Sequence, residues 1–366
     1  MHRAVMDHRS QEFSRLGAEL LENLRPVFQT SGPVIIYPSS ATGAWEAAIV
    51  NTLSPGDRVL MFETGHFSQQ WRQLTERFGV VVDYIPGNWR RGGSAVDLAA
   101  RLDADGGHAY KAVMAVHNET STGATTSIAD IRRQMDRSNH PALLMVDTVS
   151  SLASMDYRHD EWGVDVTVAG SQKGLMLPPG LSFNALSEKA LAANKNAKLA
   201  RSYWDWLEML GPNRNGFFPF TPATTLLYGL QEALSMLQEE GLANVFHRHY
   251  RHAEATRTAV RTWGLEIVCE EPREYSNSVT AVLMPEGHNA DRLRSFILEN
   301  FDMSLGAGLS RLAGKVFRIG HLGSFNDLML AGTLSGVEMG LGLAQVPHQP
   351  GGVTAALQCL TSTCKS

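Results

Sequence analysis

Lys173 is the residue of this sequence best suited to covalent chemistry. It stands in Ser171-Gln172-Lys173, just after a run of apolar residues, and no other charged residue occurs from Val166 to Asn184. A lysine at the end of a strand is usually a solvated surface charge. In apolar surroundings, however, a lysine loses its proton more readily, and the free amine can attack an aldehyde.

Asp147 is the acid that could work with this amine. It closes the apolar run Ala142-Leu-Leu-Met-Val146, and the carboxyl ends of strands in a parallel α/β sheet line one ligand crevice. A buried carboxylate can keep a pyridine nitrogen protonated, and the protonated ring then stabilises a carbanion at a substrate α-carbon. The alternative is that Asp147-Thr148 simply caps a helix, and the position of Asp147 alone supports both interpretations equally.

Small hydroxyl-bearing residues form a third candidate element. Pro38-Ser-Ser-Ala-Thr-Gly43 leads into Ala44-Trp-Glu-Ala-Ala-Ile49, which has helical character. Free N–H groups at a helix N-terminus bind phosphate, and small side chains let the anion approach. Serine and threonine are also ordinary helix caps, so this segment gains weight only beside Lys173 and Asp147.

The elements that must position these residues follow an α/β pattern. Apolar residues at helical spacing predict a helix over residues 10–29. Short apolar runs separated by helix-length stretches then predict a mainly parallel sheet covered on both faces. The runs are 33–37, 58–62, 80–85, 112–116 and 142–146, with two more at 165–169 and 181–186. The last two stand close together in the sequence, so one of them could run antiparallel to its neighbour.

A second, smaller α/β domain is predicted beyond residue 242. Its strands are expected at 265–269, 278–284 and 315–319, with a helix from Asn289 and a last helix over 326–344. Residues after Pro347 are rich in Gly, Thr and Ser, which predicts a loose tail. The expected division is therefore 1–242, 243–346 and 347–366.

Composition narrows the choice of partners. The 366 residues carry a formal net charge of −5, which gives no electrostatic reason to expect nucleic acid or a membrane surface as a partner. The three cysteines, Cys269, Cys359 and Cys364, lack zinc-site spacing, so no metal is expected. The N-terminus lacks the apolar core of a signal peptide, and no stretch reaches the roughly 18 apolar residues of a membrane span. The simplest location is the cytoplasm.

Several blocks of the sequence together resemble one enzyme family. From Asp7 to about Gly340, they resemble the class V aminotransferases, namely the alanine–glyoxylate and serine–glyoxylate group, and most strongly its bacterial serine–glyoxylate branch. The blocks are DHRSQEF, NTLSPGD, HNETSTG, VDTVSSL, EWGVDV, GSQKGLMLPPG, FTPAT and GKVFRIGHLG. The resemblance implies a fold-type I transferase that depends on pyridoxal 5'-phosphate, with a seven-stranded large domain and a smaller C-terminal domain.

The resemblance also assigns roles around the cofactor ring. Lys173 would be the Schiff-base lysine and general base, and Asp147 would pair with the pyridinium nitrogen. Val149 would lie against the ring. Phe67 would stack on the ring where relatives often carry tryptophan, although from the sequence alone it could equally be a core phenylalanine. Thr120 would bind the phenolic oxygen, with a simple turn as the competing explanation.

The remaining roles concern the cofactor's phosphate and the substrate. Gln172 and the backbone around Ala41 and Thr42 would hold the phosphate. Arg318 would grip the substrate α-carboxylate, because a planar guanidinium can donate two parallel hydrogen bonds. A lone arginine in a strand more often forms a surface ion pair.

A homodimer with shared active sites is implied by Thr221, which in the family reaches the phosphate of the neighbouring subunit. Relatives usually have a tyrosine that also contacts the phosphate, whereas this sequence has Phe218 at that place. One hydrogen bond to the cofactor would then be missing, with a loss of about 0.5–3 kcal/mol.

The implied reaction is transamination from a small amino acid to glyoxylate, giving glycine and a keto acid. Serine is the first candidate donor, followed by alanine and aspartate. One alternative is another class V enzyme, such as a lyase or cysteine desulfurase, which would need a mobile cysteine at the site. Another is a non-catalytic protein that keeps the fold. Its main support is that the sequence begins after the Pro-Gly-Pro segment that helps to wall the substrate site in relatives.

Overall fold

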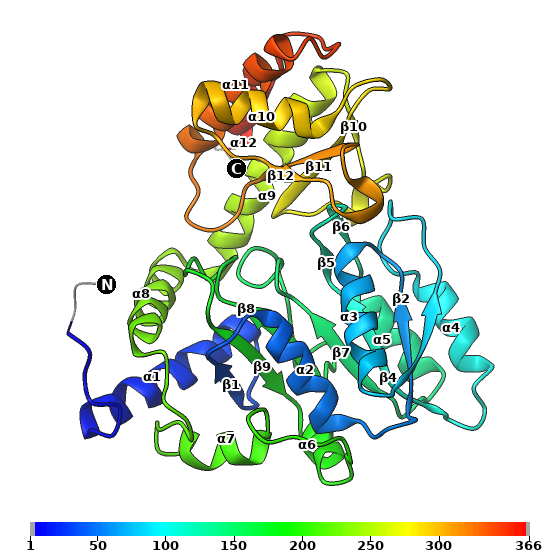
Figure 1. Ribbon diagram of the computed structural model, residues 1–366, viewed down its shortest axis with the longest axis vertical. Helices are drawn as coiled ribbons and strands as arrows, with labels where there is room; N and C mark the ends of the chain where they lie inside the picture. Colours follow the sequence, from blue (N-terminus) through cyan, green and yellow to red (C-terminus); the bar gives the residue numbers. More distant parts are fainter. Residues whose placement is uncertain (1–3, 364–366) are drawn as a thin grey trace.

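The large part of the molecule is built on a seven-stranded sheet. The computed structural model describes residues 4–363, and the sheet has the strand order β1-β9-β8-β7-β4-β2-β3 (Figure 1). Neighbouring strands are parallel except β9, which is antiparallel to both β8 and β1. The bounds are β1 Val34–Tyr37, β2 Arg58–Phe62, β3 Val81–Ile85, β4 Tyr110–Val116, β7 Leu143–Asp147, β8 Val166–Gly170 and β9 Ser182–Leu186. The predicted strands and the expected antiparallel member near Lys173 are confirmed.

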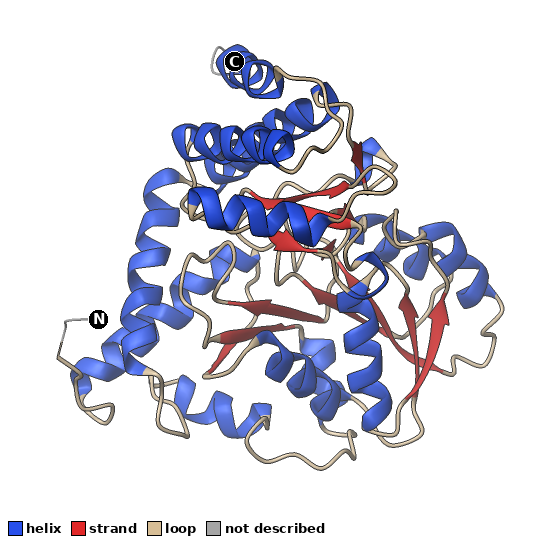
Figure 2. Ribbon diagram, turned by 45° about the horizontal axis from the view of Figure 1, so that its top comes forward, coloured by secondary structure: helices blue, strands red, loops and turns tan. Residues whose placement is uncertain are grey.

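Helices cover both faces of this sheet, as Figure 2 shows with strands between helices. Successive residues of each strand point to opposite faces, so Val113 and Ala115 of β4 enter one core while Ala112 and Met114 enter the other. The first core is closed by α1 (Gln11–Phe28), α4 (Ala95–Asp103), α5 (Ile128–Arg137) and α8 (Thr224–Glu240). The second is closed by α2 (Ala41–Thr52), α3 (His66–Arg77), α6 (Glu188–Asn194) and α7 (Trp206–Asn213).

The smaller part lies above the carboxyl edge of the large sheet in Figure 1. Its four strands are antiparallel in the order β10-β11-β13-β12. They are β10 Glu266–Ile267, β11 Val279–Leu283, β12 Gly306–Ala307 and β13 Val316–Gly320, packed with α9 (Leu242–Thr262), α10 (Ala290–Phe301) and α11 (Asp327–Leu343). The short pieces are β5 Asn118–Glu119, β6 Ala124–Thr125 and the 3₁₀ turns η1 Pro272–Glu274 and η2 Ser310–Leu312. A domain boundary at residue 242 coincides with the start of α9 and stays a prediction.

The prediction of a loose tail after Pro347 is wrong for the residues that the structure describes, up to Thr363. Residues Gly352–Thr363 form the helix α12, in which Ala356 and Leu360 are buried in the core of the smaller part. Glu338 of α11 anchors the entry to this helix, because its carboxylate accepts hydrogen bonds from the N–H groups of Gly351 and Val353. The small residues that suggested a loose tail allow α12 to pack closely. This packing depends on the neighbouring helices, so the sequence of the segment alone does not predict it.

No helix within residues 4–363 is both long and apolar enough to cross a membrane.

We expect Leu360→Ala to lower the free energy of unfolding by about 2–4 kcal/mol, because a large side chain would leave a cavity in a closed core. Leu357→Ala on the same helix is the matched control, since Leu357 is 43% exposed and Leu360 only 4%. Urea unfolding followed by circular dichroism measures both variants. Equal losses in the two would mean that α12 does not dock as described.

Candidate active site

The loop that carries Lys173 is closed on itself between β8 and β9. Ser171 Oγ donates to the carbonyl of Pro178 (2.8 Å) and accepts from the N–H of Leu181 (3.2 Å). Lys173 is partly buried within this loop. Burial lowers the pKa of Lys173, and the positive charge of Arg318 lowers it further. An amine that is easily deprotonated therefore lies within electrostatic reach of a guanidinium, although the two come from different parts of the chain.

Asp147 lies at the carboxyl end of β7 and is only 3% exposed. Its Oδ1 accepts from the N–H of Val149 (2.7 Å), and its Oδ2 accepts from the indole N–H of Trp45 (2.9 Å). Burial raises the pKa of Asp147 to about 7, with these two donors opposing the rise and Glu119 adding to it. No cationic side chain of residues 4–363 forms an ion pair with Asp147. The carboxylate is thus suited to a cationic group on a ligand.

The N-terminus of α2 lies beside Gly170, where β8 ends. A Cβ added to Gly170 would lie 3.3 Å from Ala41 Cβ, 3.0 Å from Gln172 Oε1 and 3.6 Å from Val149 Cγ1. These side chains therefore converge on one point. Gln172 Oε1 is buried and has no hydrogen-bond partner in the described part of the chain, and Ser40 gives α2 no side-chain cap. A phosphate group needs donors, and the free N–H groups of this uncapped helix start and the side-chain NH2 of Gln172 can supply them.

Thr42, unlike Ala41, has an exposed side chain. It occupies the second position of α2, where a backbone N–H has no acceptor within the helix. The sequence analysis predicted that the backbone of Thr42, and not its side chain, holds the phosphate, and an exposed side chain is compatible with that prediction.

Glu119, which the sequence analysis missed, holds the segment that presents Phe67. Its fully buried carboxylate accepts from the N–H groups of Phe67 (3.2 Å) and Ser68 (3.1 Å) and from the hydroxyl of Ser121 (2.6 Å). Phe67 is partly buried in the first turn of α3, at one edge of the second core. A signal existed in the sequence, since an acid within HNETSTG stands among uncharged residues.

Thr120 belongs to a hydroxyl network in the turn between β5 and β6. Its Oγ1 donates to Ser150 Oγ (2.7 Å), and Ser150 Oγ in turn donates to the carbonyl of Asn118 (2.8 Å). Asn118 Nδ2 also donates to Ser150 Oγ (2.7 Å). Thr120 is thus a turn residue whose hydroxyl is held in place by Ser150. The lone pairs of this hydroxyl can still accept a hydrogen bond from a ligand.

Arg318 projects from β13 towards the edge of the large sheet. Its Nε donates to the carbonyl of Ala307 (2.8 Å), and its Nη1 donates to the carbonyl of Thr120 (2.9 Å). No carboxylate of the described residues forms a salt bridge with it, so the alternative of a surface ion pair is not found there. The two backbone bonds fix the plane of the guanidinium and leave N–H groups on its other edge for a ligand.

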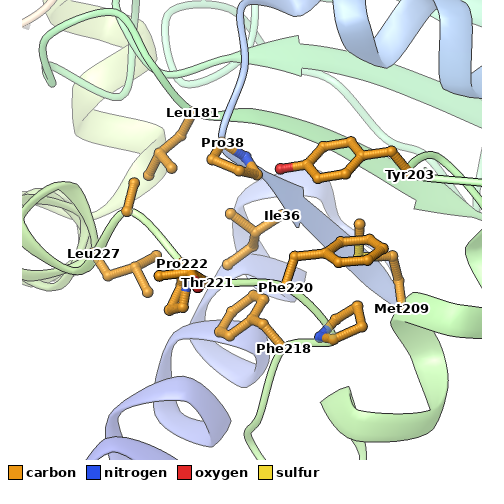
Figure 3. A pocket seen from close by; sticks show the side chains of 12 residues that line it. Ile36, Pro38, Leu181, Tyr203, Met209, Phe218, Phe220, Thr221, Pro222 and Leu227 are labelled. Carbon is orange, nitrogen blue, oxygen red and sulfur yellow. The ribbon is translucent and has the colours of Figure 1, made fainter. Parts of the chain in front are cut away.

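Phe218 and Thr221 lie apart from this group. They line a pocket formed with Ile36, Pro38 and Tyr203, and neither Lys173 nor Asp147 contributes to its wall (Figure 3). Thr221 is exposed, and the neighbouring Phe220 stacks on Tyr203 with ring centroids 4.6 Å apart. Phe218 and Thr221 are thus predicted site residues that line a separate pocket.

Comparison with known proteins identifies the family. Residues 1–317 match the model of class V aminotransferases. The chain belongs to this family. Class V aminotransferases depend on pyridoxal phosphate, and so does this one. The resemblance, the fold type and the cofactor predicted from the sequence are confirmed.

Individual relatives cover nearly the whole aminotransferase. It is 47% identical to a serine–glyoxylate aminotransferase of Methylorubrum extorquens, over 96% of this chain and 89% of that protein. It is 46% identical to an L-aspartate–glyoxylate aminotransferase of Paracoccus denitrificans, over 97% of this chain and 90% of that protein. Among solved structures, ureidoglycine–glyoxylate aminotransferase from Bacillus subtilis superposes with a TM-score of 0.90 at 26% identity, covering 100% of this chain and 93% of that one.

We expect Gly65→Ala to disturb the site, because the new Cβ would overlap Ser121 Oγ and lie 2.5 Å from Glu119 Cγ. Displacing the Glu119 carboxylate would release the first turn of α3, at a cost of about 1–3 kcal/mol. Calorimetry gives the loss of melting temperature, and fluorescence titration gives the weaker binding of pyridoxal phosphate. Gly106→Ala is the control, since no heavy atom lies within 4 Å of its added Cβ. Wild-type behaviour of Gly65→Ala would contradict the packing.

Proposed function

We propose that this aminotransferase moves an amino group from a small amino acid to glyoxylate, producing glycine and a keto acid. Serine is the proposed first donor, with alanine and aspartate as alternatives. The single observation that carries the proposal is that the charge of Arg318 acts on Lys173, in the loop after β8, while Asp147 ends the neighbouring parallel strand β7. The donors named for the similar proteins, serine in one and aspartate in another, support this choice of substrate class.

Pyridoxal phosphate, when bound, supplies an aldehyde that accepts the amino group and a ring that stabilises negative charge at the substrate α-carbon. Lys173 would hold it covalently, and its Nζ would then carry the proton to and from the substrate α-carbon. The lowered pKa of Lys173 suits this work, because only the neutral amine can accept that proton. Asp147 would accept a hydrogen bond from the protonated ring nitrogen, which offsets the cost of burying its charge.

The other residues of the crevice would bind and orient. Gln172 and the N–H groups at Ala41 and Thr42 would hold the phosphate. Phe67 and Val149 would enclose the ring. Thr120 would contact the phenolic oxygen, and its present bond to Ser150 requires its hydroxyl proton to turn if it is to donate there.

Arg318 would bind the substrate α-carboxylate. Two of its N–H groups are already committed to the carbonyls of Ala307 and Thr120. The guanidinium therefore needs no rearrangement to meet a carboxylate with its free edge, and pre-organised donors lose less conformational entropy on binding.

A homodimer with shared sites is part of the proposal. Thr221 and Phe218 would approach the cofactor phosphate of the neighbouring subunit, which accords with their distance from the crevice in their own chain. The exposed aromatic pair Tyr203 and Phe220 offers apolar surface for such a contact. With phenylalanine at 218, one hydrogen bond to the phosphate would be absent. The proposed compartment is the cytoplasm, where thiols such as that of Cys269 stay reduced.

The desulfurase alternative finds no support at the cysteines that the structure describes. Cys269 is buried, and burial raises the pKa of its thiol to about 11, so little thiolate forms near neutral pH. Cys359 lies in α12, in the smaller part. Cys364 falls outside the described residues. A non-catalytic role would leave the arrangement of Lys173 and Arg318 without a purpose.

The donor profile tests the proposed reaction. With glyoxylate as acceptor, we expect glycine to form fastest from serine, measured by chromatography. Lys173→Ala is the blank, and it should bind the cofactor only noncovalently and lose activity by more than about a hundredfold. If no small amino acid yields glycine above this blank, the proposed function is wrong.

We expect Arg318→Ala to raise the donor KM about 10- to 100-fold, because charge-assisted hydrogen bonds to the substrate carboxylate are lost. Initial-rate kinetics over a range of serine concentrations measure this change. Arg292→Ala in α10 is the control, since Arg292 is exposed and its guanidinium lies over the ring of Phe296 in the same helix. An unchanged KM in Arg318→Ala would remove Arg318 from its assigned role.

A further inference from the structure

Trp45 is held in one orientation beside Asp147. It lies in the second turn of α2 and is 4% exposed. Its ring stacks on that of Trp71 from α3, with centroids 5.8 Å apart and planes inclined by 12°. A stacked, buried indole cannot turn freely, so its N–H points permanently at Asp147 Oδ2, 2.9 Å away.

The two oxygens of Asp147 are restrained from different sides. Oδ1 accepts from the N–H of Val149, only two residues along the chain. Oδ2 accepts from the N–H of Trp45, which belongs to the helix α2. One donor alone would leave the carboxyl group free to rotate about its bond to Cβ. Two donors fix its plane and favour its charged form, because each hydrogen bond to a carboxylate stabilises the anion.

We propose that Trp45 is a positioning residue for the reaction: its indole N–H sets the orientation and keeps the charge of the Asp147 carboxylate, and thereby the protonation of the cofactor's ring nitrogen. This inference rests on the proposed function through the role given there to Asp147. The opposing influences on that carboxylate are burial and the neighbouring Glu119, both of which favour its neutral form.

Trp71 provides a matched control within the same stack. It is fully buried like Trp45, but its own indole N–H has no hydrogen-bond partner in the described part of the chain. Trp45→Phe and Trp71→Phe therefore remove the same atoms from the same aromatic cluster. Only the first removes a hydrogen bond to Asp147.

The first measurement uses the protein without cofactor. Infrared difference spectroscopy follows the C=O stretch of the protonated Asp147 carboxyl, identified by its loss in Asp147→Asn. We expect this group to titrate about one pH unit higher in Trp45→Phe, a tenfold gain in proton affinity, and as in the parent in Trp71→Phe. Equal titration in both variants overturns the proposal.

A second variant separates loss of the hydrogen bond from a change in packing in Trp45→Phe. Replacing Trp45 by 3-benzothienylalanine keeps the shape of the side chain and substitutes sulfur for the N–H. The same upward shift in this variant supports the hydrogen bond as the cause. A normal titration here, with a shift only in Trp45→Phe, would assign the effect to packing and overturn the proposal.

The second measurement uses pyridoxal phosphate labelled with ¹⁵N in the ring. We expect the ¹⁵N chemical shift to report a less protonated ring nitrogen in Trp45→Phe, together with a kcat about tenfold lower and a donor KM within twofold of the parent. The parent and Trp71→Phe should agree. A carboxyl shift without any change in the ring signal overturns the proposal, because Trp45 would then not act on the cofactor.

Asp147→Asn separates this failure from that of the proposed function. Full activity of Asp147→Asn would mean that protonation of the ring nitrogen does not depend on the side chain at position 147. The role that the proposed function gives to Asp147 would then be wrong, whatever Trp45 does. If Asp147→Asn is inactive while the Trp45 variants behave as the parent does, the assigned role stands and only the inference about Trp45 falls.

Discussion

The carboxylate of Asp147 is buried at the carboxyl end of the central strand β7, and no cationic side chain of the described residues pairs with it. Burial of an unpaired charge is costly, so such a group is either neutralised or matched by a ligand. The two N–H donors of Trp45 and Val149 limit that cost without removing it. The carboxylate therefore favours a cationic partner, and in the proposed site that partner would be the ring nitrogen of the cofactor.

The topology of the sheet brings the other groups to this edge. β7 and β8 are parallel neighbours, so Asp147 and Gly170 end side by side, and the loop to the antiparallel β9 starts at that edge with Lys173 in it. The same loop brings Gln172 against the start of α2. The acid, the amine and the free N–H groups at the start of α2 thus lie at the carboxyl ends of neighbouring strands, where ligands of α/β sheets bind.

The positively charged guanidinium of the proposed site comes from the smaller part of the molecule. Arg318 reaches across from β13 and is fixed there by the carbonyl of Thr120. Other contacts hold the two parts together nearby, including a hydrogen bond between His66 Nδ1 and Ser310 Oγ (2.8 Å) and an ion pair between Arg311 and Glu63 (2.7 Å). Substrate recognition in the proposed reaction therefore depends on how these two parts pack, and the chemistry at Lys173 depends mainly on the large sheet.

The sequence by itself determined which apolar runs form strands, the helix predicted over residues 10–29, and the residues that carry family motifs, because each of these is encoded in local periodicity or in an unbroken motif. Tertiary structure alone decided what lies beside those motifs. The partner of Trp45 is 102 residues away along the chain, and that of Glu119 is 52 residues away, so no local pattern identifies either contact, although an isolated acid at position 119 is visible in the sequence. The helix α12 likewise forms in a segment that composition marked as loose, because burial against neighbouring helices outweighs weak local propensity.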